Sequence, residues 1–430
     1  MTAGRLWILP VILLGVSSLP CRGQTVQRLT LKEAEQIALQ NHPQVRAAQF
    51  VAAAANELTT EARSAYYPFT FGSLTGAAAE HTSRIAAGAL SNPIIFNRYA
   101  NGITADQLIT DFGRTQNLVH SSSLHAQAEQ QSVTATRADV LLRVDQVYFG
   151  ALQAQAVLKV AQETVKARQL VSDQVTALAK SKLKSGLDVS FANVNLAEAK
   201  LLLVQAQNDV ESSYAELSAA LGYADDRRFE LQEEPLPPAP PGDLSQLVDE
   251  AFRQRPDLVQ RGLDANAAHS FARAERDLWF PSVSFIGSAG LIPYKQQFLT
   301  SRYAAAGVNV NIPLFNGRLF NARRAEAEFQ AQAEDQQVQD LRNSVARDVR
   351  VAWLKANTAY QKLDLTDQLL KEATEALQLA QARYNLGLSS IVELSQAQLN
   401  ETEAELEQAR AKYDYQGQFS ALNYQLGLLR

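Results

Sequence analysis

The chain has 430 residues, 46% of them hydrophobic, and a formal net charge of −5 at pH 7. This composition is sufficient for a folded core. A mildly acidic chain is a poor candidate for nucleic-acid binding, so no nucleic-acid partner is expected. The sequence contains a single cysteine, which excludes a fold built on disulfide bonds within the chain.

Residues 1–23 are typical of a secretory signal peptide. Arg5 precedes an apolar run over residues 6–16, which is too short to span a bilayer. Cys21, near the end of this segment, raises the alternative of a lipoprotein. The three residues before it make a poor lipobox, because small residues are expected next to the cysteine, and lipidation of Cys21 stays open.

The mature chain begins with two predicted helices. In the first, from Thr30 to Asn41, apolar residues recur at helical spacing, and Glu33 completes a capping box with Thr30. Pro43 ends this helix and is tolerated in the first turn of the next one. A second, alanine-rich helix is therefore predicted over residues 44–65 at a different angle.

The hydrophobic period then changes from that of a helix to that of a strand. Apolar and polar residues alternate faintly over 69–71 and 103–105 and clearly over 282–291 and 308–312, which predicts four strands. Four strands cannot close a barrel, and open edges are not viable in lipid, so a membrane location requires several chains to pool their strands. Aromatic residues gather at the strand ends, as in a membrane girdle: Tyr66, Tyr67, Phe96, Tyr99, Trp279, Phe280, Tyr294, Phe298 and Tyr303.

Two very long helices follow the strands. Residues 114–185 and 318–386 contain no proline, and each run of about 70 residues could extend roughly 100 Å. Over 345–384, small or apolar residues alternate at spacings of four and three, with Thr366 as the exception, and the same seam recurs over 140–165. This heptad seam predicts helices that coil around close neighbours.

Each long helix ends at a glycine turn, after which a shorter helix returns. Gly186 and Gly387 mark these turns and are expected to need a positive φ. Leu187 and Leu388 follow them and are predicted to be exposed at the helical tips. Because the returning helices are only about half as long, each is predicted to stack end to end with an alanine-rich helix beside the same long helix.

The order of these elements occurs twice. The chain is interpreted as a signal peptide over 1–23, a first structural repeat over 24–229, a proline-rich linker over 230–243 and a second repeat over 244–430. The linker is expected to be stiff and extended. Leu31, Ala38, Pro43 and Pro68 of the first repeat recur in the second as Leu244, Ala251, Pro256 and Pro281.

This order of elements, and the segment from Tyr384 to Leu394 with Ala397-Gln398 behind it, resembles the TolC-like outer-membrane efflux proteins, the outer membrane factors of tripartite efflux and type I secretion systems. The resemblance covers essentially the whole mature chain. It implies a mainly α fold with membrane β structure: a homotrimer whose pooled strands form one barrel in the lipid of the bacterial outer membrane, and whose helices continue it as a tube across the periplasm. The implied partners are a periplasmic adaptor (membrane fusion) protein and an inner-membrane efflux pump or ABC exporter. No cofactor is implied.

The resemblance also assigns roles at the periplasmic end of the tube. It places a constricting tyrosine at Tyr384 and acidic rings at Glu393 and Gln396, and the tip residues Gly186, Leu187, Gly387 and Leu388 would bind the adaptor. Three Glu393 carboxylates near the axis would attract cations and disfavour anions. An ionic lock of the family corresponds to Ser389 and Ala192 here, so a more loosely held gate is expected. Two simpler interpretations stay open: Glu393 as a solvated charge, and Tyr384 as the last residue of the seam.

Catalytic motifs are absent from the sequence. The five histidines lack the spacing of a zinc protease, His120 and His125 lie on different faces of a helix, and there is no cysteine pair, phosphate loop or nucleophile elbow. Neither an enzyme nor a metal site is predicted. The alternative class is a periplasmic coiled-coil adaptor or scaffold, which the alternating strands and aromatic clusters disfavour. The cargo, the particular pump and adaptor, and the resting state of the gate stay open.

Overall fold

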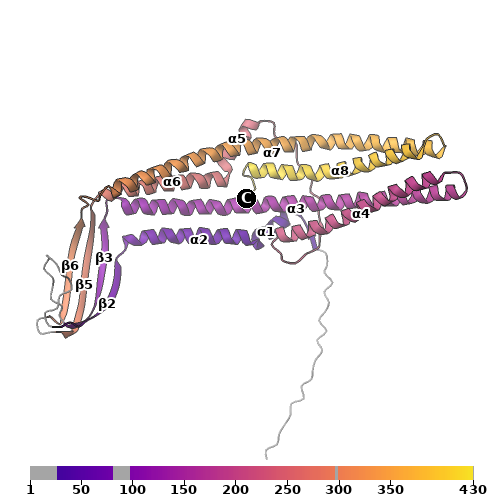
Figure 1. Ribbon diagram of the computed structural model, residues 1–430. Coiled ribbons are helices and arrows are strands. Elements are labelled where there is room, and N and C mark those ends of the chain that lie inside the picture. Colours follow the sequence, from indigo (N-terminus) through magenta and orange to yellow (C-terminus); the bar gives the residue numbers. More distant parts are fainter. Residues whose placement is uncertain (1–26, 81–96, 296–298, 430) are drawn as a thin grey trace, which may run out of the picture.

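The computed structural model describes residues 27–80, 97–295 and 299–429. The predicted signal peptide with Cys21, and the aromatic residues Phe96 and Phe298, lie outside the described residues. Within them, the chain forms a long rod of helices that run lengthwise, with a sheet at one end of the rod (Figure 1).

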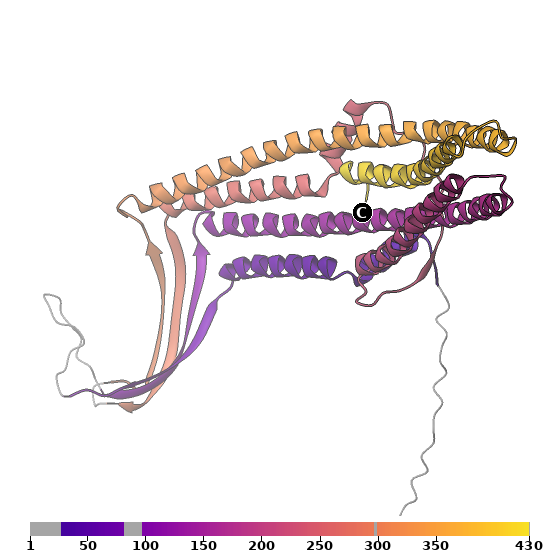
Figure 2. The ribbon, with the colours of Figure 1, turned by 45° about the vertical axis from the view of Figure 1, so that its right-hand side comes forward.

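The sheet has four antiparallel strands in the order β2-β3-β5-β6, and it curves away from the helical rod (Figure 2). The pairing of β3 with β5 joins the two repeats. Within the described chain, β2 and β6 are each paired on one side only, which leaves two open edges for other chains. The prediction of four strands is confirmed: β2 (Phe69–Ala77), β3 (Arg98–Thr110), β5 (Ser282–Lys295) and β6 (Arg302–Asn311).

The short helices begin as their sequences predict. Ahead of α1 (Leu31–Asn41), the side chain of Thr30 accepts from Glu33 N at 3.3 Å, and Glu33 Oε2 accepts from Thr30 N at 2.9 Å, which confirms the capping box. Pro43 is the first residue of α2 (Pro43–Arg63). The second repeat has the same pair, α5 (Leu244–Gln254) and α6 (Pro256–Arg276). Single 3₁₀ turns then lead into the sheet at Ser64–Tyr66 and Asp277–Trp279.

Two long helices of 67 residues each, α3 (Arg114–Lys180) and α7 (Leu319–Asn385), run the length of the rod. The returning helices, α4 (Gly186–Ala220) and α8 (Ile391–Gln425), have 35 residues each. α2 and α4 lie in line along α3, and α6 and α8 lie in line along α7 (Figure 1). The predicted end-to-end stacking is therefore confirmed, and α3 also packs against α6 and α8, which joins the two repeats along the rod.

Glycines make the two end-to-end joints possible. Gly222 has a φ of +81°, and a Cβ on it would lie 3.0 Å from the backbone of Asn41 at the end of α1. Gly427 has a φ of +76°, and a Cβ there would lie 2.8 Å from the backbone of Gln254. A side chain at either position would be strained by its φ and would push the stacked helices apart.

Most of the seam of α7 is buried as predicted, and Leu363, Leu370 and Leu377 are half-buried. Thr366, its polar exception, donates its hydroxyl to the carbonyl of Lys362 at 2.8 Å, which satisfies a buried polar group within the helix itself. The other buried seam residues are Val345, Val349, Ala352, Ala356, Ala359, Ala373, Ala380 and Tyr384.

A small parallel sheet at the middle of the rod was not predicted. β1 (Gln27–Leu29) pairs with β4 (Phe229–Leu231), which ties the start of the described chain to the start of the linker. Tyr148 of α3, next to the seam residue Val147, lies within hydrogen-bond distance of Leu29 O, at 2.9 Å, and of Gln232 O in the linker, at 2.7 Å. Its equivalent in the second repeat, Trp353, donates Nε1–H to Pro241 O at 2.6 Å. The linker is thus fastened to both long helices.

Asp145 of α3 is a buried carboxyl at this level of the rod, with a side chain that is almost fully excluded from solvent. Its Oδ1 makes no hydrogen bond to any described residue. Burial, together with the neighbouring carboxylate of Glu35, raises the pKa of Asp145 to about 7. Because this pKa lies above the unfolded value of 3.8, the folded chain binds more protons between these two pH values, and the contribution of Asp145 to stability falls as pH rises through this window.

We therefore expect Asp145→Asn to stabilise the protein at pH 8 and to change little at pH 4. A pKa shift of this size corresponds to a gain in the free energy of unfolding of at most about 4 kcal/mol. The measurement is the free energy of urea unfolding of both proteins across this pH range. The difference between them should grow with pH, and a difference that does not depend on pH would contradict the assignment.

Candidate gate and docking site at the helical tips

The two helical turns lie next to each other at the end of the rod opposite the sheet (Figures 1 and 2). They are related by the internal duplication: Lys182 has a φ of +60° and takes the place of Gly387, which has a φ of +75°. Each is followed by a strongly exposed leucine, Leu183 at 71% and Leu388 at 67%. Lys182 and Leu183 are not among the site residues predicted from the sequence.

The expectation of a positive φ at Gly186 is wrong. Gly186 is the first residue of α4, because Ser185 caps that helix and forms a capping box with Asp188. α3 ends earlier than predicted, at Lys180, and Lys182 supplies the left-handed residue of the turn. Gly186 remains at the exposed tip, and Leu187 is 65% exposed in the first turn of α4.

Tyr384 is almost fully buried in a cluster at the tips, where it packs with Val175, Ala192, Ile391 and Leu394. Lys184 Nζ lies 3.6 Å from the centroid of its ring. Burial raises the pKa of the Tyr384 hydroxyl, with a smaller contribution from Asp188. In the single chain, Tyr384 therefore occupies the end of the seam.

Glu393 and Gln396 share an exposed face of α8. Glu393 Oε1 lies 3.0 Å from Arg383 Nε on α7, and both side chains are about half exposed. The Gln396 amide donates to Asn400 Oδ1 at 2.9 Å. A ring of Glu393 carboxylates would therefore carry a guanidinium partner on each carboxylate. This ion pair was not predicted, because the two residues lie on different helices.

Ala192 and Ser389, the two positions that correspond to the ionic lock of the family, carry no charge. Ala192 is 2% exposed and faces the Tyr384 cluster. The hydroxyl of Ser389 is buried and makes no hydrogen bond within the described part of the chain. These two positions cannot hold neighbouring helices by charge.

A set of polar side chains, the polar layer, joins the helical pair of the first repeat to α8; four of them, Arg168, Ser172, Ser395 and Gln398, are buried. At its centre, Arg168 is only 5% exposed, and its Nη2 donates to Gln398 O at 2.6 Å and to Thr402 Oγ1 at 2.9 Å. Burial lowers the pKa of Arg168, while the carboxylates of Glu401 and Glu405 act in the opposite direction. The polar layer comprises Arg168, Ser172, Asn193, Asn195, Ser395, Gln398 and Thr402.

The polar layer could have been found in the sequence. Arg168 and Ser172 occupy the seam positions that Ala373 and Leu377 occupy in the second repeat. The predicted seam of the first repeat ends at Val165, before these two residues. A charged residue at a seam position normally marks a specific partner, because a buried charge is costly unless it is hydrogen-bonded.

The predicted girdle residues fall into two groups at the two ends of the sheet. Tyr66, Tyr67, Trp279 and Phe280 lie just before β2 and β5, on the side of the helices. At the far end, Tyr99 pairs with Gly76 and Tyr294, and Tyr303 pairs with Gly290. The ring of Tyr303 lies over Gly290 and Gly102, where any side chain would collide with it.

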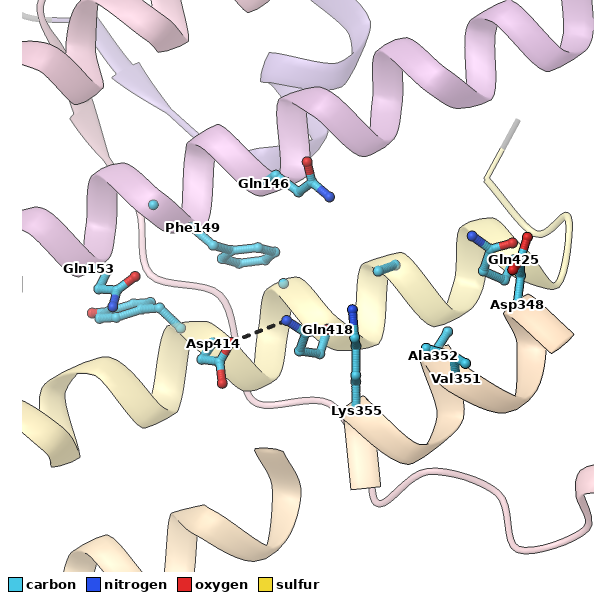
Figure 3. Close-up of a pocket in the computed structure, with 14 residues that line it drawn as sticks. Gln146, Phe149, Gln153, Asp348, Val351, Ala352, Lys355, Asp414, Gln418 and Gln425 are labelled. Atoms are coloured by element: carbon cyan, nitrogen blue, oxygen red, sulfur yellow. Dashed lines mark hydrogen bonds between the residues drawn. The ribbon is translucent and has the colours of Figure 1, made fainter. Parts of the chain in front are cut away.

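A groove of about 430 Å³ opens midway along the rod between α3, α7 and α8 (Figure 3). Gln146 and Phe149 line it from α3, Lys355 from α7, and Asp414 and Gln418 from α8, and its lining includes no histidine, serine or cysteine. In the described ranges no group of three histidine, cysteine or acidic side chains is placed to hold a metal ion. Among the described helices, none has both the length and the hydropathy of a membrane span.

An open antiparallel sheet, attached to a rod of two duplicated helical units, is the fold of an outer-membrane export channel subunit. The model of the family described as outer membrane efflux protein matches residues 35–223 and 247–428, so the chain belongs to that family. It is a subunit of a trimeric export duct in the bacterial outer membrane, with a long helical extension into the periplasm, and the scaffold alternative is not favoured.

Known proteins agree with this assignment. The chain is 24% identical to the outer membrane protein TolC of Escherichia coli K12 over 340 residues, which is 74% of this chain and 69% of TolC. The Campylobacter jejuni CmeC outer membrane channel has the same fold, with a TM-score of 0.78 and 17% identity over 98% of this chain and 94% of that one. The open state of the Neisseria gonorrhoeae MtrE channel gives a TM-score of 0.75 and 20% identity, covering 93% and 90%.

Proposed function

We propose that the helical tips are the docking end of the duct, where a periplasmic adaptor connects it to an inner-membrane efflux pump or ABC exporter. The observation that carries this proposal is the exposure of Leu183 and Leu388 at the end of the rod opposite the sheet. Neighbouring apolar side chains exposed on a folded protein mark a surface that binds a partner. Leu187 extends this surface along α4, Gly186 begins α4 at the same tip, and Gly387 supplies the left-handed residue of the α7–α8 turn. The proposed role is transport, and we assign no catalytic group.

The same end is proposed to be the gate. Glu393 and Gln396 supply the exposed polar face that would line the tube, and Tyr384 holds α7 against α4 from the seam. The polar layer around Arg168 supports a lock of a different kind from the one at Ser389 and Ala192, because it links α8 to α3 and α4 within one chain. The aromatic residues at the two ends of the sheet are proposed to lie at the two membrane surfaces.

The assembly is tested by the mass of the particle extracted in detergent from the outer-membrane fraction. We expect about three chains per particle, since one chain contributes an open sheet and membrane barrels have no free edges. A monomer or dimer in the soluble periplasmic fraction would contradict the proposal and would support the scaffold alternative.

The gate is tested by restoring an ionic lock. Ala192→Asp alone should destabilise the tips by about 1–3 kcal/mol, because it places a carboxylate in a buried apolar cluster. Adding Ser389→Arg should recover part of this loss and reduce the resting conductance in planar bilayers. The matched control is Ser389→Arg alone. An unchanged conductance in the double variant would count against a gate at these positions.

A further inference from the structure

The two tips differ in charge, although the duplication makes them equivalent in backbone. The α3–α4 turn carries Lys180, Lys182 and Lys184. The corresponding residues of the α7–α8 turn are Asn385, Gly387 and Ser389, all uncharged. A trimer would therefore alternate basic and neutral tips around its end.

One of the three lysines is engaged within the chain. Lys184 lies over the ring of Tyr384, and its Nζ is 3.5 Å from Tyr384 O. The nearby carboxylate of Asp188 is also engaged, since it accepts from Ser185 N at 2.8 Å and from Ser185 Oγ at 2.7 Å. Lys180 and Lys182 are exposed and form no ion pair with any described residue. Two positive charges at this tip are thus free for a partner.

The backbone at Lys182 gives an independent reason to expect a role for its side chain. A φ of +60° is unfavourable for any residue with a Cβ, and the equivalent position holds glycine. Glycine at position 182 would relieve this strain. A strained residue whose side chain forms no hydrogen bond or ion pair with any described residue suggests that the side chain acts outside the fold.

We propose that the α3–α4 tip binds a carboxylate-bearing turn of the adaptor, with Lys180 and Lys182 supplying the charge and Leu183 the apolar contact. The α7–α8 tip, which is neutral, would make the apolar contact through Leu388 alone. This inference rests on the proposed adaptor docking at the tips. Charge complementarity would then fix which adaptor hairpin meets which tip, because a carboxylate turn gains nothing from the neutral tip.

The test uses two synthetic helical-hairpin peptides as probes. One has a turn that contains leucine flanked by two glutamates, and the other has glutamine in place of each glutamate. Binding to the detergent-solubilised channel is measured by fluorescence anisotropy at about 50 and 300 mM salt. The glutamate hairpin should bind at least about ten-fold more tightly at low salt, and this preference should shrink at high salt.

The channel variant is Lys180→Gln with Lys182→Gly, which removes both free charges and keeps the turn compatible with a positive φ. We expect it to lose the preference for the glutamate hairpin while its thermal stability stays equal or rises. The matched control is Lys200→Gln, which removes an exposed lysine of α4 away from the turn and should keep the preference. A preference that survives in the double lysine variant, or equal binding of both hairpins to the wild type, would overturn the proposal.

Two further outcomes separate this inference from the docking proposal. If variants of Leu183 and Leu388 abolish export but the hairpin preference does not depend on the lysines, docking stands and the charge proposal fails. If neither hairpin binds the wild type and the leucine variants export normally, both proposals fail. The double lysine variant could instead lose binding to vesicles containing phosphatidylglycerol while it still binds the glutamate hairpin like the wild type. That result would assign the lysines to lipid and would also overturn the proposal.

Discussion

Substituting Leu183→Asp together with Leu388→Asp is expected to reduce export to the level of a strain that lacks the gene. Both side chains are about 70% exposed, so they contribute little to the stability of the chain itself. An apolar anchor buried in a protein interface is worth about 2 kcal/mol, and the trimer repeats each substitution three times. The measurement is resistance to those toxic compounds to which deletion of the gene sensitises the cell.

The leucine variant should still assemble in the outer membrane with the mass and single-channel conductance of the wild type. The matched control is Leu183→Met with Leu388→Met, which keeps an apolar side chain of similar size and should export normally. Normal export by the aspartate variant, at wild-type abundance, would rule out docking through the tips. Loss of the trimer would instead assign the leucines to assembly.

Substituting Arg168→Ala is expected to open the resting channel. The Arg168 guanidinium makes two hydrogen bonds to α8, one buried and one partly buried, and a hydrogen bond to a charged group is worth about 2 kcal/mol. The loss of even one of these hydrogen bonds would shift the balance between closed and open tips by roughly thirty-fold, which planar-bilayer recordings would register as a higher open probability. Arg168→Lys should have an intermediate effect, because one ammonium cannot reproduce the fork of a guanidinium.

The control for Arg168 is Arg143→Ala on the same helix. Arg143 lies 3.8 Å from Glu216, and both side chains are 61% exposed, so this pair contributes less than about 1 kcal/mol. Arg143→Ala should therefore conduct like the wild type. If Arg168→Ala lowers the unfolding temperature but leaves the open probability unchanged, the polar layer has a structural role only.

Much of this protein could be predicted from the sequence because the decisive signals are local. The capping box at Thr30, the proline starts of α2 and α6, and the seam over 345–384 each depend on residues within a few turns of one another. The alternation of apolar and polar residues in the strands is also local. Because of the duplication, each predicted element has a counterpart in the other repeat that supports the same prediction. These signals were sufficient for the fold class and for the stacking of short helices beside long ones.

The candidate site was harder to predict from the sequence, because its contacts join residues that are far apart in the chain. Arg168 meets Gln398, and β1 pairs with β4, only because the two repeats pack side by side. The prediction of the first turn at Gly186 is wrong because Ser185 caps α4 immediately before Gly186, so that Lys182 supplies the left-handed residue of the turn.

The sequence by itself determined the helices, the four strands of the large sheet and their order, since hydrophobic period and end signals act over short distances. Only the tertiary structure decided which side chains are buried at the tips. Tyr384 is compatible with a pore constriction in sequence, but α4 packs over it through Ala192 and buries it. Whether a side chain is buried depends on which elements pack against it. The sequence of one helix does not specify which neighbouring element will cover a given side chain.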